Sequence, residues 1–157
     1  MGWWSTDILG GDTPLDFKSE FYSKLKLDQF KDKGDKVKTA FEKYQKKFIS
    51  DGEMDNILNK WGCGEPDESF YRDYKSIGYQ VLAVILMENG CQISYTLKDI
   101  MLNWIPTDNW ASEDDERKTT ILNLVKTLTA YDGSVPFKIK SKGLFEVWAE
   151  KIQNKNI

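Results

Sequence analysis

Residues 66–90, PDESFYRDYKSIGYQVLAVILMENG, decide the fold of this chain. In the first half, Phe70, Tyr74 and Ile77 recur at helical spacing, which predicts one apolar face. From Val81 to Met87 every residue is apolar, the pattern of a helix that other helices surround. Asn89-Gly90 ends the segment, because glycine readily takes the left-handed conformation just past a helix. We therefore expect a long central helix from Pro66 to about Glu88.

Amphipathic segments on both sides predict further helices around this one. A helix is expected from about Pro14 to Leu27, with Asp12 or Thr13 as its N-cap. The clearest helical periodicity lies further along and joins four apolar residues, which are Val37, Phe41, Tyr44 and Phe48. A short helix with Met54, Ile57, Leu58 and Trp61 follows, and another is expected over Leu97 to Trp104, capped by Ser94 or Thr96.

The last third of the chain predicts two more helices and one short strand. Ser112 with Asp115 resembles a capping box, so a helix is expected to begin there and to end at Asp132-Gly133. Val135 to Ile139 reads as a strand, and Leu144 to Ile152 as a last amphipathic helix. The fold class is therefore mainly α: one domain over residues 1–157, built as a bundle of six or seven helices. The sequence leaves open whether one small β-hairpin is added to it.

The charge balance and the two cysteines indicate a compartment and bear on the class of partner. The chain has 157 residues and a net charge of −3, from 22 basic and 25 acidic residues. This balance, with Arg only at positions 72 and 117, argues against nucleic-acid binding. The Lys-rich helix faces are interpreted as solvated surfaces. No apolar stretch predicts a membrane span and no leader is recognised, so we expect a cytoplasmic protein with Cys63 and Cys91 reduced.

No histidine occurs anywhere in the chain, which removes the commonest catalytic and metal-binding side chain. Cys63 lies between two glycines and is expected to be accessible, but it has no histidine to activate it. The run Glu113–Glu116 fits the first turn of a helix better than a metal site, because consecutive helical residues point in different directions. The sequence therefore predicts no catalytic residue, no cofactor and no metal ligand.

Six tryptophans, mostly at segment ends, are the feature that most suggests recognition. Tryptophan buries a large area with little loss of entropy and is enriched at binding hot spots. The alternative interpretation is that such residues cover the edges of the core. If some serve binding, Trp3, Trp4 and Trp110 are the residues expected to bind a partner protein.

The opening residues carry a resemblance. Met1-Gly2-Trp3-Trp4-Ser5, followed by Gly10-Gly11-Asp12-Thr13-Pro14-Leu15-Asp16, resembles the start of small uncharacterised proteins of tailed bacteriophages. More distantly it is similar to a bacterial domain-of-unknown-function family that opens Met-Gly-x-Trp-Gly, where this chain has Ser5. The resemblance covers about the first seventeen residues. It implies a phage or bacterial origin, and hence the host cytoplasm, but no catalytic residues.

Two functions follow as predictions. The first is a non-enzymatic protein-binding module, a phage-encoded factor that binds and modulates a host protein. The alternative is a metal-dependent hydrolase, a nuclease or phosphoesterase, whose carboxylates Asp7, Asp12 and Asp16 would converge in a pocket. A structural or virion-associated role is a third interpretation, and the sequence predicts no oligomeric state.

Overall fold

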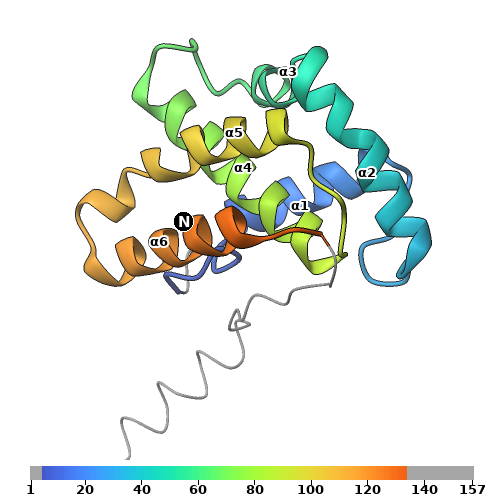
Figure 1. The fold of residues 1–157 in the computed structure, drawn as a ribbon. Coiled ribbons are helices and arrows are strands. Elements are labelled where there is room, and N and C mark those ends of the chain that lie inside the picture. Colours follow the sequence, from blue (N-terminus) through green and yellow to red (C-terminus); the bar gives the residue numbers. More distant parts are fainter. Residues whose placement is uncertain (1–4, 134–157) are drawn as a thin grey trace, which may run out of the picture.

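The computed structural model describes residues 5–133, and this part of the chain is mainly helical, as predicted (Figure 1). Its two 3₁₀ turns, η1 (Ile105–Thr107) and η2 (Trp110–Ser112), lie between the last two helices. The six α-helices of the described residues are α1 (Asp12–Lys24), α2 (Asp35–Ser50), α3 (Glu53–Lys60), α4 (Ser69–Glu88), α5 (Tyr95–Trp104) and α6 (Asp115–Ala130).

Helix α4 is the central element, as its apolar second half predicts. It contacts each of the other five α-helices, which lie around it in Figure 1. Every residue from Ser76 to Met87 is buried. A helix can bury its whole circumference only when neighbours cover all its faces, so α4 organises the described part of the chain.

On one side of α4, rings from α1 and α2 pack around Tyr79 of α4. We call these rings the aromatic cluster and define it by Phe17, Phe21, Tyr44, Phe48 and Tyr79. The ring of Phe21 meets that of Phe48 edge to face at 5.5 Å, and Phe48 meets Tyr79 at 6.5 Å. Edge-to-face contacts of this kind add about 0.5–1.5 kcal/mol to the stabilisation from burial. The helical spacing of the rings thus becomes a continuous apolar interior.

Gly78 allows α1 and α3 to approach α4 closely. A Cβ atom at this position would lie 2.5 Å from Met54 Sδ and 2.9 Å from Phe17 Cε1. Because real Cβ atoms do not come so close to other heavy atoms, any larger residue here must push these side chains aside.

The other side of α4 holds a buried ion pair in place of rings. Arg117 Nη2 on α6 donates to Asp108 Oδ2 at 2.8 Å and to Gln80 Oε1 at 2.8 Å. Its Nη1 donates to the backbone carbonyls of Thr6 and Asp7 at 3.0 and 3.1 Å. We call these five residues the polar cluster; it joins the N-terminal loop, α4, the segment after η1 and α6.

Several helix ends differ from the predictions. Ser94 caps α5, as expected, by accepting from the Leu97 amide at 3.2 Å. The predicted cap of α6 was wrong: Asp114, not Ser112, accepts from the Arg117 amide at 2.9 Å. The carboxylate of Asp114 is a stronger acceptor for that amide, and Ser112 belongs to η2.

The N-termini of α1 and α4 also correct the sequence analysis. Neither Asp12 nor Thr13 caps α1; Gly11 holds the cap position, without a side-chain hydrogen bond. Helix α4 begins at Ser69 rather than near Pro66, because a turn precedes it. In that turn the Glu68 amide donates to the Glu65 carbonyl at 3.0 Å.

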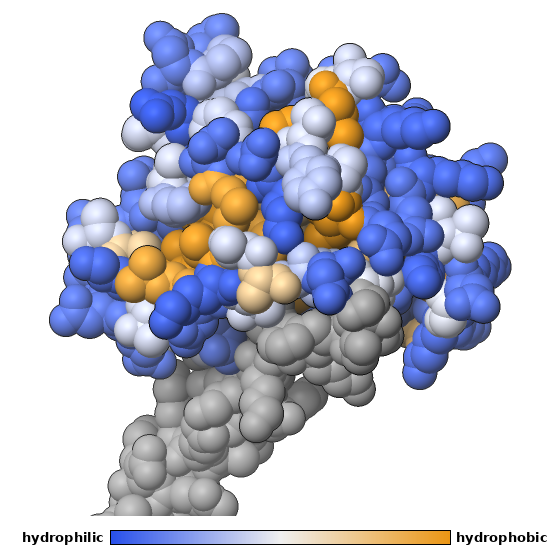
Figure 2. Space-filling view, viewed as in Figure 1, coloured by the Kyte–Doolittle hydropathy of each residue, from blue (hydrophilic) through white to orange (hydrophobic). Residues whose placement is uncertain are grey.

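The surface of one face is mostly hydrophilic, with apolar side chains gathered between α5 and α6 (Figure 2). Ile100, Leu102 and Val125 are half-buried and pack against the core, so these helices supply part of its outer edge. None of the helices described is both long enough and apolar enough to cross a membrane. The predicted strand over Val135 to Ile139 and the predicted helix over Leu144 to Ile152 lie outside the described residues.

Candidate functional site

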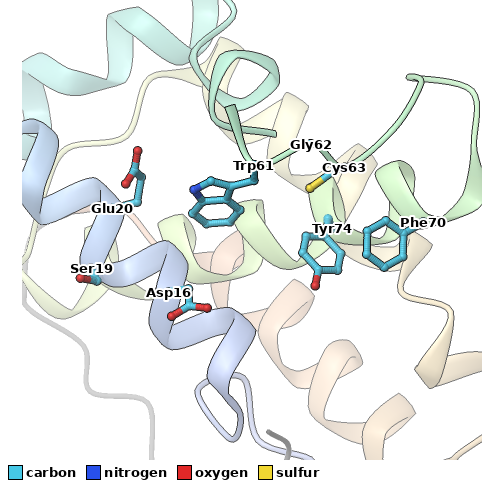
Figure 3. A pocket seen from close by; sticks show the side chains of 8 residues that line it. All are labelled: Asp16, Ser19, Glu20, Trp61, Gly62, Cys63, Phe70 and Tyr74. Atoms are coloured by element: carbon cyan, nitrogen blue, oxygen red, sulfur yellow. The ribbon is translucent and has the colours of Figure 1, made fainter. Parts of the chain in front are cut away.

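A surface groove of about 620 Å³ lies between α1, the end of α3 and the start of α4 (Figure 3). Its lining combines acidic, aromatic and small residues from these three places. The lining residues are Asp16, Ser19, Glu20, Trp61, Gly62, Cys63, Phe70 and Tyr74. We call it the acidic groove, because two of the eight residues are carboxylates and none is basic.

The α1 wall of the groove carries both carboxylates. Asp16 and Glu20 are one helical turn apart and therefore lie on the same face of α1. Glu20 Oε1 accepts from Lys60 Nζ at 2.8 Å, an ion pair at the edge of the groove. No ion pair joins Asp16 to any residue that the structure describes. Asp16 is exposed, so its charge is available to a ligand.

The turn after α3 places Trp61 and Cys63 in the groove. Gly62 has a φ of 68°, and its amide donates to the Asn59 carbonyl at 3.1 Å. The Cys63 amide donates to the Leu58 carbonyl at 3.1 Å, which completes a Schellman motif. Such a motif needs the left-handed conformation at the position of Gly62, where glycine has no steric cost. The indole of Trp61 packs on a core ring, that of Phe17, at 4.7 Å between centroids.

The opposite wall consists of two rings from the first turns of α4. Phe70 and Tyr74 are one turn apart, and their ring centroids lie 4.5 Å from each other. Phe70 is 55% exposed, a large apolar surface to leave in water at the edge of a groove. Together with Trp61 these rings give the groove three aromatic faces (Figure 3).

Cys63 corrects a prediction, because its side chain is not accessible: the residue is only 5% exposed. Burial raises the pKa of its thiol, so the thiolate is disfavoured. Since the thiolate is the nucleophilic form, this cysteine is poorly suited to covalent catalysis. Cys91 is fully buried, as expected for a small apolar residue, and burial raises the pKa of its thiol to about 12.

The residues predicted to bind a partner have different places in the structure. Trp3 and Trp4 lie outside the described residues. Trp110 is half-buried, and its ring lies 4.9 Å from the guanidinium carbon of Arg117. At least one face of this indole therefore covers the polar cluster. This agrees with the alternative interpretation, in which tryptophans at the ends of segments cover the edges of the core.

The carboxylates proposed for a hydrolase are not gathered around one point. Asp7, Asp12 and Asp16 do not form a metal-ligand group, and no set of three or more Cys, Asp or Glu residues in the described part could hold an ion. The run Glu113–Glu116 instead supplies the N-cap and the first turn of α6. The carboxylates that do share a site are Asp16 and Glu20.

The polar cluster is the other concentration of charge, but it is closed to ligands. The side chains of Arg117 and Asp108 are 0% and 2% exposed. Burial raises the pKa of Asp108, but the hydrogen bond and charge of Arg117, with Gln80 and the Ala111 amide, outweigh burial and lower it. The carboxyl of Asp108 is thus ionised at neutral pH, and its ion pair with Arg117 holds the helices together.

The sequence analysis named most of the groove residues but did not predict that they form one site. Phe70 and Tyr74 were assigned to a helix face, Trp61 to a helix end and Asp16 to a possible metal site. The i, i+4 spacing of Asp16 with Glu20 and of Phe70 with Tyr74 was a usable signal for shared faces. That the two faces lie opposite each other depends on helix packing.

No protein-family model, no curated protein and no solved structure matches this chain.

Proposed function

We propose that this protein is a non-enzymatic protein-binding module whose acidic groove takes a lysine- or arginine-bearing segment of a partner. The observation that carries the proposal is that the groove joins the available carboxylate of Asp16 to three aromatic rings. A carboxylate attracts a cation, and ring faces attract the same cation through their quadrupoles, by about 0.5–2 kcal/mol. The two attractions act on one class of side chain.

The chain uses the same interaction internally, which supports this choice of ligand. Lys75 Nζ lies 4.4 Å from the centroid of the Trp104 ring. Exposed aromatic residues beside charged ones are also typical of binding hot spots, because a ring buries much area with few rotatable bonds. Phe70 has that position at the edge of the groove.

Lys60 is an internal competitor for the ligand that we propose. Its ammonium is paired with Glu20, and its side chain is 59% exposed, so it can swing away into water. An incoming cation that displaces Lys60 gains a second carboxylate. A surface pair of this kind is worth roughly 0–1 kcal/mol, so the displacement costs little.

The test is a calorimetric titration with a short peptide of alternating lysine and alanine, compared with the same peptide carrying glutamine for lysine. Asp16→Asn and Phe70→Ala should each weaken binding of the lysine peptide by about fivefold, which corresponds to about 1 kcal/mol. Lys60→Gln should strengthen it. Asp35→Asn and Tyr95→Ala, which change exposed residues away from the groove, are the matched controls. Equal binding by all five variants would contradict the proposal.

The partner that we propose is a host protein, on the resemblance of the opening residues to phage proteins. The expected result is a stoichiometric complex recovered from host cells with the tagged chain and lost with Asp16→Asn. Recovery of the same complex with Trp3→Ala and Trp4→Ala, but not with Asp16→Asn, would place the contact in the groove. Loss only with the tryptophan variants would move it to the N-terminal segment.

A further inference from the structure

The loop between α1 and α2 is opposite in chemistry to the acidic groove. Nine lysines and only four acidic residues lie between Lys24 and Lys47, in a chain with a net charge of −3. The loop also carries Phe30, which is 81% exposed. We call Lys26, Phe30, Lys31 and Lys33 the basic tip; all four are exposed. In Figure 1 this loop lies at the edge of the molecule.

Two carboxylates hold the backbone of the basic tip in one shape. Asp28 Oδ1 accepts from the amides of Phe30 and Lys31 at 2.8 and 3.1 Å. Asp32 Oδ2 accepts in return from the Asp28 amide at 2.7 Å, while its Oδ1 is paired with Lys36 at 3.1 Å. A loop ordered in advance loses less entropy when it binds, so Phe30 is presented as a ready anchor.

At the start of the loop, a lysine has a backbone conformation that is unfavourable for any residue with a side chain. Lys26 has a φ of 55°, the left-handed region that favours glycine. The amides of Lys26 and Leu27 donate to the carbonyls of Ser23 and Tyr22 at 3.0 and 2.9 Å, so this residue ends α1 in the place that glycine usually takes. The result is a third cation beside Lys31 and Lys33 in the same loop.

We infer that the basic tip of one copy of this chain seats in the acidic groove of another. The inference rests on the proposed function of the groove and names one of its occupants. In this complex the lysines of the tip lie opposite Asp16 and Glu20 of the groove. Phe30 of the tip packs beside the rings of Trp61 and Phe70. No residue of the tip lines the groove within one copy, so the contact must join two copies.

The fixed shape of the tip and its interleaved carboxylates favour this occupant over a polyanion. Asp28 and Asp32 stand among the lysines, and they would repel the closely spaced phosphates of a nucleic acid. The acidic groove, by contrast, can be filled by one or two lysine side chains together with one ring. Because the groove is filled in the self-associated form, a partner's basic segment must compete with the tip.

The experiment is analytical ultracentrifugation of the full chain over a wide concentration range, at low and high salt. The sedimentation coefficient should rise with concentration at low salt and stay constant at high salt, since salt screens surface charges. Phe30→Ser and Lys31→Glu should each abolish the rise. Tyr95→Ser removes another exposed ring, and Lys47→Glu makes the same charge change at another exposed position. Both lie outside the two surfaces and should preserve the rise.

Mixing two variants identifies the two surfaces. Lys31→Glu alone and Asp16→Lys alone should remain monomeric, because each lacks one surface. A mixture of the two should form a complex, because the unchanged tip of the Asp16→Lys variant can bind the unchanged groove of the Lys31→Glu variant. A wild-type chain that is monomeric at every concentration, or a mixture that does not associate, overturns the inference. If the lysine peptide still binds the groove in that case, only the inference fails; if it does not, the proposed function fails as well.

Discussion

The two sides of α4 are equally buried but are held together by different forces. On the α1 and α2 side, the aromatic cluster fills space with rings that contact one another at several angles. On the α6 side, one guanidinium satisfies a carboxylate, an amide oxygen and two backbone carbonyls. Ring packing is stabilised mainly by burial and tolerates changes of similar volume. The polar cluster is directional, so removing Asp108 leaves the buried guanidinium of Arg117 with neutral acceptors but without its opposite charge.

The largest effect should come from breaking the polar cluster at Asp108. Asp108→Ala leaves the buried charge of Arg117 without its carboxylate, which costs about 3–5 kcal/mol of the free energy of unfolding. Urea denaturation at neutral pH measures the loss. Asp99→Ala removes an exposed carboxylate from α5 and should change stability by less than about 0.5 kcal/mol. Equal losses in the two variants would show that the polar cluster contributes nothing special.

Gly78→Ala tests a place on the aromatic side where an added methyl group has no room. The added methyl group meets Met54 and Phe17, so a loss of about 1–3 kcal/mol is expected. Helix propensity alone predicts the opposite sign, a gain of about 1 kcal/mol when alanine replaces glycine inside a helix. Asn123→Ala, at an exposed position of α6, measures the propensity effect by itself. A stabilised Gly78→Ala variant in the same denaturation assay would disprove the close approach of α1 and α3.

The cap of α6 supports the end of the polar cluster, because the Arg117 amide donates to Asp114. Asp114→Ala should lower stability by about 1 kcal/mol, the usual cost of losing an N-cap. Ser112→Ala should cost much less, since Ser112 does not cap the helix. Thermal unfolding of the two variants compares them directly. A larger loss for Ser112→Ala would restore the capping box that the sequence suggested.

The smallest effect concerns Asp73, which lies on α4 beside the polar cluster. Its Oδ1 accepts from the Asn109 amide at 3.0 Å, while burial, followed by the charge of Asp108, raises its pKa. A raised pKa in the folded state means that the ionised form opposes folding, so this cost is present at neutral pH and disappears as pH falls toward the unfolded value near 4. Asp73→Asn should therefore stabilise the chain at pH 7 by on the order of 0.5 kcal/mol. The gap should close near pH 4 in urea titrations at both pH values.

Periodicity was enough to predict the aromatic side but not the polar side. Phe41, Tyr44 and Phe48 repeat at helical spacing, and the apolar run Val81 to Met87 could only be a surrounded helix. Arg117 gave no such signal. It stands among Glu116 and Lys118 in a polar stretch, and its burial follows from the way α6 crosses α4. Hydrophobic pattern reports which residues avoid water, whereas a buried charge depends on partners far away in sequence.

The acidic groove shows the same limit. Each of its walls is a local i, i+4 pair that sequence can give, but their separation depends on the close approach that Gly78 permits between α1 and α4. For the turn that places Trp61, the sequence analysis gave only the two glycines on either side of Cys63. Cys63 was expected in the open because it lies between glycines, yet the same turn folds it inward.

The hydrogen bond from Arg117 to the carbonyl of Thr6 joins residues that are 111 positions apart in the chain. During synthesis the first residues leave the ribosome long before Arg117 does, so α1 to α4 must wait with the N-terminal loop unfastened. The nascent chain therefore leaves the side of α4 that carries Gln80 uncovered until α6 has been made.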